Sequence, residues 1–60
     1  MATDRILSNI AVHGFVWARN AEAKRFQRAG RSARVAQTMA HILLTSILKA
    51  NYENRALVSI

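Results

Sequence analysis

The sequence predicts an all-α fold, a two-helix antiparallel hairpin that is completed by oligomerisation or by docking into a larger complex. The chain has no proline and only two glycines, and it is rich in residues that favour helices, such as alanine, arginine and leucine. The stretch AGRS at positions 29–32 indicates a helix stop followed by a helix start. A chain of 60 residues buries only about 60% of the surface that its unfolded form exposes, and no cysteine is present to supply a disulfide. A partner chain is therefore expected to complete the core.

The first helix is expected at about residues 4–28. Thr3 can cap it, and Asp4 then lies at the positive end of the helix dipole. Between Ile10 and Ala18 the helix is apolar around much of its circumference, which is typical of a helix surrounded by protein. A row of small residues would allow another helix backbone to approach closely, and it comprises Ala11, Gly14, Ala18 and Ala21.

A short turn at about residues 29–32 is expected to join the two helices. Gly30 suits the position that follows a helix, and Ser32 can cap a second helix at about residues 33–56. The alternative is one continuous helix through Gly30, since a lone glycine costs only about 1 kcal/mol in a helix. Such a rod would be roughly 75 Å long and would need a partner along its whole length. The AGRS stretch favours the hairpin.

The second helix carries a wide apolar surface. Met39, Leu43 and Ile47 follow the spacing of one helical face, and Leu44 and Leu48 form an adjacent row. One facing helix would cover only part of this surface. The predicted helix-packing interface therefore comprises Ala11, Gly14, Ala18, Met39, Leu43, Leu44, Ile47 and Leu48. The apolar tail at residues 57–60 is expected either to fold back or dock on a partner, or to be a frayed terminus.

Positive charge is concentrated in the middle of the chain. The net charge is +6, and residues 19–34 hold six basic side chains and one acidic side chain. The candidates for contact with phosphate or another anion are Arg19, Lys24, Arg25, Arg28, Arg31 and Arg34. Phe26 is the only aromatic residue among them, which argues against a reader of single strands. Duplex phosphates, a membrane surface and simple solvation of the hairpin end all remain compatible with this stretch.

The remaining polar residues do not form a catalytic or metal-binding pattern. His13 and His41 each lie on a predicted helix with apolar neighbours, where an axial ligand to a tetrapyrrole is conceivable, but no metal-binding motif accompanies them. We expect ordinary histidine side chains, no metal and no cofactor. The acidic residues Asp4, Glu22 and Glu53 are scattered, so we expect neither an enzyme nor a small-molecule substrate.

These observations predict a small non-enzymatic helical protein that acts through helix–helix packing, as a homo-oligomer or an accessory subunit. A basic nucleic-acid-binding protein is the alternative, and a peripheral membrane-associated subunit is a further one. The longest uncharged runs are 13 and 14 residues, whereas a membrane-spanning helix needs about 20. The start of the chain does not resemble a signal peptide. We therefore expect a cytoplasmic protein, either free or associated with a membrane surface or a membrane complex.

Overall fold

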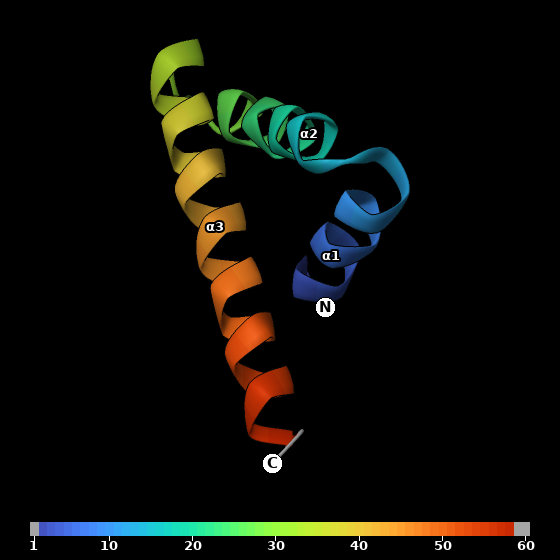
Figure 1. Cartoon of the computed structure of the whole chain (residues 1–60). Coiled ribbons are helices and arrows are strands. Elements are labelled where there is room, and N and C mark those ends of the chain that lie inside the picture. The colour runs from blue at the N-terminus through green and yellow to red at the C-terminus, as the bar shows by residue number, and fades with distance from the viewer. Residues whose placement is uncertain (1, 59–60) are drawn as a thin grey trace.

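The computed structural model describes the backbone of residues 2–58 and the side chains of residues 3–54. The described residues form three helices, α1 (Ala2–His13), α2 (Phe15–Arg28) and α3 (Ala33–Val58) (Figure 1). The all-α class is thus confirmed. The two-helix hairpin is wrong in one respect, because the first predicted helix is broken in two at Gly14. The first helix also begins at Ala2, which places Thr3 within its first turn.

Gly14 separates α1 from α2 without an intervening loop. Its backbone has φ 94° and ψ 164°, a region that is essentially restricted to glycine. Its N–H donates to the carbonyl of Ile10 at 2.9 Å, and its own carbonyl accepts from the N–H of Ala18 at 3.1 Å. Gly14 therefore makes the last backbone hydrogen bond of α1 with its N–H and the first of α2 with its carbonyl. The predicted row of small residues through Ala11 and Ala18 is interrupted at this point.

The turn between α2 and α3 agrees with the sequence prediction. Gly30 has φ 105°, its N–H donates to the carbonyl of Gln27 at 3.0 Å, and the N–H of Arg31 donates to the carbonyl of Phe26 at 3.0 Å. This pair of bonds is a Schellman motif, which ends α2. The Ser32 hydroxyl oxygen accepts from the N–H of Val35 at 3.3 Å and caps α3. The continuous rod is therefore wrong.

Helix α3 runs to Val58, two residues beyond its expected end. Residues 57–58 of the predicted apolar tail therefore belong to this helix, and residues 59–60 lie outside the described residues. With 26 residues, α3 is about 39 Å long, whereas the 14 residues of α2 span about 21 Å. The shorter helix can cover only part of the longer one, which leaves the rest of α3 to α1 and to solvent.

Helices α2 and α3 meet along a seam of alanines. Ala23 from α2 and Ala36 and Ala40 from α3 are buried, and Phe26 packs against them. Small side chains allow the two helices to approach closely at this seam. This is the most extensive contact between helices among the described residues.

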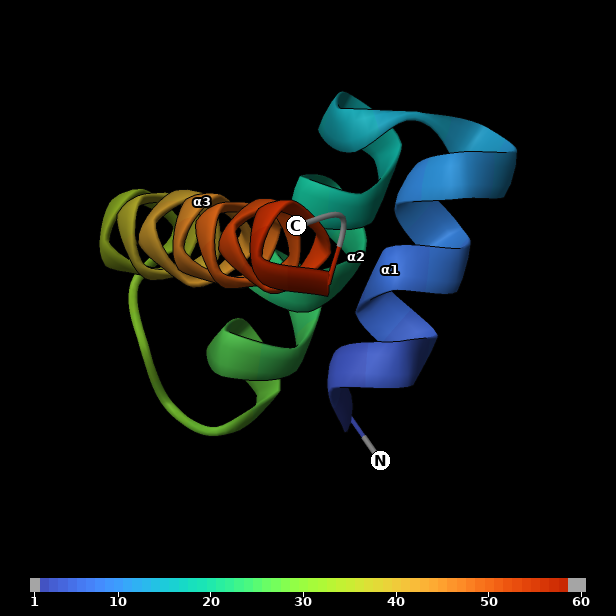
Figure 2. The same ribbon diagram turned by 60° about the horizontal axis from the view of Figure 1, so that its bottom comes forward.

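The break at Gly14 lets α1 fold back beside the other two helices (Figures 1 and 2). The resulting core takes one buried residue from each helix, Ile6 from α1, Ala18 from α2 and Leu44 from α3. Burial of an isoleucine or leucine side chain stabilises a fold by about 1.5–3 kcal/mol. The partly buried residues that surround this core are Ile10, Phe15, Leu43 and Ile47.

An ion pair also joins α1 to α2. Arg5 donates from Nη2 to Oε1 of Glu22 at 2.9 Å, and Nε of Arg25 lies 3.9 Å from the same oxygen. Glu22 is only 4% exposed, whereas the Arg5 side chain is partly exposed. The negative charge of the buried Glu22 carboxylate is therefore compensated by these two arginines. A separate hydrogen bond crosses the α2–α3 contact, in which Nε2 of Gln37 donates to Oδ1 of Asn20 at 3.2 Å.

Replacing Gly14 with L-alanine is expected to lower the free energy of unfolding by about 1–3 kcal/mol, because an L side chain is strained at this φ and ψ. Apart from the atoms of Gly14 and its two chain neighbours, no described atom lies within 4 Å of the position that the new Cβ would take, so the loss arises from the local backbone conformation and not from a tertiary clash. Urea denaturation followed by circular dichroism measures the loss. Synthesis with D-alanine at position 14 is the matched control, because a D residue favours mirror-image dihedrals and should preserve stability. An L-alanine variant as stable as the parent would contradict this account of the break.

Replacing Arg5 with methionine is expected to lower the free energy of unfolding by about 2–3 kcal/mol, because it removes the closer partner of a buried carboxylate. A domain of this size has only about 3–9 kcal/mol in total, so the change should be large in a denaturation curve. Lys24→Met removes an exposed cation from α2 and serves as the control, with an expected change within about 0.5 kcal/mol. Equal losses in the two variants would show that the Arg5–Glu22 pair contributes nothing specific.

Candidate functional site

An apolar hollow lies on the surface of α3 beside the last turns of α2. Its lining residues are Phe26, Met39, Ile42, Leu43 and Ser46, and none of these five carries a charge. Phe26 comes from α2, and the other four follow the spacing of one side of α3. Ile42 is 60% exposed although it is one of the large hydrophobic residues of the chain. We call these five residues the apolar hollow.

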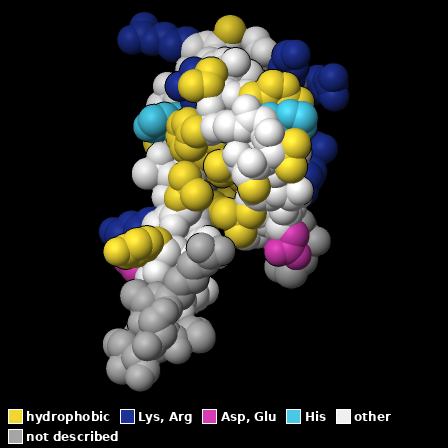
Figure 3. Space-filling view, turned by 45° about the vertical axis from the view of Figure 1, so that its right-hand side comes forward, with side chains coloured by type: hydrophobic (Ala, Val, Ile, Leu, Met, Phe, Trp, Pro, Cys, Tyr) yellow, Lys and Arg dark blue, Asp and Glu magenta, His cyan; other side chains and the backbone are white. Residues whose placement is uncertain are grey.

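Other apolar side chains are exposed near the break at Gly14. Val12, Val16 and Trp17 are all exposed, and Trp17 stacks on His13 with ring centroids 3.9 Å apart. Figure 3 shows hydrophobic side chains gathered in the middle of one face, between the two histidines. The surface of a single chain thus carries apolar groups in more than one place.

Part of the predicted cationic set is gathered on the outer side of α2. Lys24, Arg25 and Arg28 line one hollow together with Trp17, Asn20 and Ala21. We call these six residues the basic hollow. Arg31 is exposed in the turn and Arg34 is exposed in the first turn of α3. The basic residues therefore crowd the end of the molecule where α2 meets α3.

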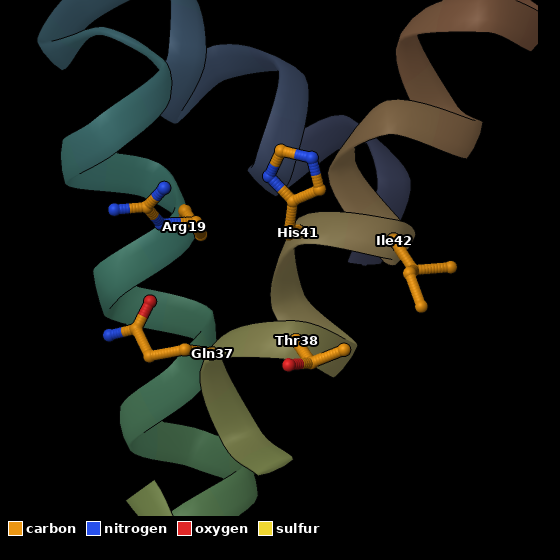
Figure 4. A pocket seen from close by; sticks show the side chains of 5 residues that line it. All are labelled: Arg19, Gln37, Thr38, His41 and Ile42. Carbon is orange, nitrogen blue, oxygen red and sulfur yellow. The ribbon is translucent and has the colours of Figure 1, made fainter. Parts of the chain in front are cut away.

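Arg19 lies apart from this group. It projects from α2 beside a third hollow, whose other lining residues, Gln37, Thr38, His41 and Ile42, come from α3 (Figure 4). The side chains diverge in this view, with Ile42 pointing away from α2. Such a surface does not bring several polar groups to one point, as a ligand pocket would.

The two histidines occupy separate environments. His13 stacks on Trp17. The ring of His41 makes an edge-to-face contact with Phe15, with the ring centroids 5.6 Å apart. They lie at opposite sides of the face shown in Figure 3. Among the described residues, no three side chains of histidine, cysteine, aspartate or glutamate are grouped so that they could hold a metal ion.

The structure divides the predicted helix-packing residues into three groups. Ala18 and Leu44 are buried within the chain itself. Met39, Leu43, Ile47 and Leu48 are partly buried, whereas Ala11 and Gly14 are exposed. The predicted helix-packing interface did not include Phe26 or Ile42, although both line the apolar hollow. The position of Ile42, three residues after Met39, was a usable signal, but Phe26 could be placed only once the α2–α3 crossing was known.

Comparison with known proteins finds no matching family, no matching curated protein and no matching solved structure. In the part of the chain that the structure describes, no helix has the length and apolarity that crossing a membrane requires.

Proposed function

We propose that this chain is a small non-enzymatic helical protein that acts by packing its apolar helix surface against another protein, as a homo-oligomer or as an accessory subunit of a larger complex. The observation that carries the proposal is the apolar hollow. Phe26, Met39 and Leu43 are partly exposed in it, and the lining residue Ile42 is largely exposed to solvent. A hollow of this kind accepts the apolar side of a helix, which is a common mode of protein recognition.

Packing of a partner on α3 would also supply what the short chain lacks. Only six hydrophobic residues of the described part are buried, and four of these are alanines. Alanine contributes little buried apolar area, so the core of one chain provides modest stabilisation. Coverage of Ile42 and Met39 by another protein would add larger side chains to the buried set.

A photoreactive amino acid at position 42 tests this function directly. In cells that express the full chain, irradiation should give an adduct of defined mass when the probe replaces Ile42, because this side chain lies at the proposed contact. Thr45 lies three residues further along α3, is exposed and is not a residue of the apolar hollow, so the same probe at position 45 is the control. Ile42→Asp should also reduce association about tenfold or more, because it places a charge in an apolar contact, whereas Thr45→Asp should not. Equal labelling at positions 42 and 45 would count against the proposal.

A second function is favoured by a separate observation, the gathering of one tryptophan and three cations in the basic hollow. Lys24, Arg25 and Arg28 could contact phosphates while Trp17 offers an aromatic surface beside them. We infer that binding of nucleic acid through this side of α2 is the alternative function. It involves none of the residues of α3, so it is independent of the apolar hollow.

Trp17 is the only tryptophan of the chain and reports on the basic hollow through its fluorescence. Titration with duplex DNA at low salt should change this emission, and Lys24→Gln or Arg28→Gln should each lower the slope of the logarithmic salt dependence by about one. Lys49→Gln removes a positive charge from α3, outside the basic hollow, and should leave the slope unchanged. A response to anionic vesicles but not to DNA would instead indicate membrane attachment. No response to either would remove this alternative.

A further inference from the structure

One side of α3 is free of charged residues over most of its length. Helical spacing places six residues on this side, which we call the apolar flank: Val35, Met39, Ile42, Leu43, Ser46 and Ala50. The flank contains the four α3 residues of the apolar hollow, and its length from Val35 to Ala50 is about 22 Å. Val35 is 45% exposed and Ala50 is exposed, so the flank is open beyond both ends of the hollow.

The spacing along the flank is suited to a second helix. Val35, Met39, Ile42 and Ser46 are separated by four, three and four residues, which is the alternation found where two helices pack side by side. The helix that covers this side must itself offer uncharged side chains over the same length. A second copy of α3 satisfies this condition.

Charge determines how a second copy can be oriented. Five cations lie at the end of the molecule where α2 meets α3, namely Lys24, Arg25, Arg28, Arg31 and Arg34. Two copies packed in parallel would bring both of these basic ends together, and like charges at short distance repel. An antiparallel pair places the basic ends at opposite ends of the dimer.

The acidic residue of α3 supports the antiparallel orientation. Glu53 is the only acidic residue in this helix, is exposed, and follows Ser46 by seven residues, so it extends the same side of α3. When the two-fold axis passes between Ile42 and Leu43, Val35 of one copy faces Ala50 of the other and Met39 faces Ser46. Glu53 then lies opposite position 32, next to Arg31 of the other copy.

We propose that the partner of the apolar flank is a second copy of this chain, packed antiparallel about a two-fold axis near Ile42 and Leu43. This inference rests on the proposed function, since it names the protein that the apolar hollow receives. The contact is isologous, so each pairing between the copies occurs twice. The uncharged flank favours a second copy of α3 as the partner. The basic end and Glu53 favour the antiparallel orientation of the two copies.

Disulfide trapping tests the register, because the natural chain has no cysteine. Val35→Cys and Ala50→Cys are made as separate variants, one with an affinity tag, and are mixed under oxidising conditions. The two positions are about 22 Å apart within one helix, far beyond the Cα separation of about 7 Å that a disulfide allows, so any bridge joins two copies. The mixture should form a covalent heterodimer, and each variant alone should not. Met39→Cys with Ser46→Cys is a second pair in the same register.

The controls separate failure of this inference from failure of the proposed function. Thr45→Cys is exposed outside the flank and should not bridge to either partner. Glu53→Lys should lower the yield of the Val35–Ala50 heterodimer about two- to five-fold at low salt, in line with a surface ion pair.

Bridging of Val35→Cys to itself would overturn the antiparallel orientation. A monomer in light scattering, together with an adduct at position 42 to a different protein, would overturn self-association and leave the proposed function standing. A monomer that gives no adduct at position 42 would overturn both.

Discussion

The positive φ of Gly14 is the constraint on which the rest of the structure depends. In one continuous helix, Ile6 and Ala18 would be about 18 Å apart along the axis, and Arg5 and Glu22 about 26 Å apart. In the folded chain the first two share a core cluster, and the second two form an ion pair of 2.9 Å. Because glycine adopts this conformation without side-chain strain, α1 can fold back, pack against Leu44 of α3 and supply Arg5 to the buried Glu22 carboxylate.

This arrangement separates the surface of the molecule into regions of different chemistry. The inner side of α3 is used within the chain by the alanine seam and by Leu44, while its apolar flank faces outward. The basic hollow is lined by residues of α2 alone, and none of them belongs to the flank. The proposed contacts with a protein through α3 and with an anion through α2 therefore use different residues.

The all-helical class, the turn at Gly30 and the cap at Ser32 could be predicted because each depends on residues that are near one another in sequence. The break at Gly14 could not, since a glycine inside an apolar helical pattern carries the same local signal whether it is retained in the helix or ends it. Its outcome depends on what α1 gains by folding back, and both the Ile6–Leu44 contact and the Arg5–Glu22 pair join residues far apart in sequence. The location of the apolar hollow could not be predicted for the same reason, because Phe26 lies beside α3 only as a result of the way in which α2 and α3 cross.

The alanine seam has a consequence for how this architecture can vary. Ala23, Ala36 and Ala40 set the separation of α2 and α3 with the smallest side chain that a helix tolerates well. Because the turn at residues 29–32 ties the two helices together at one end, a larger residue in the seam would change their crossing angle more than their distance at the turn. That rotation would displace α1, which is attached to the other end of α2, relative to Leu44. The seam thus acts as a spacer between α2 and α3, and a larger side chain within it would also move α1 through its attachment to α2.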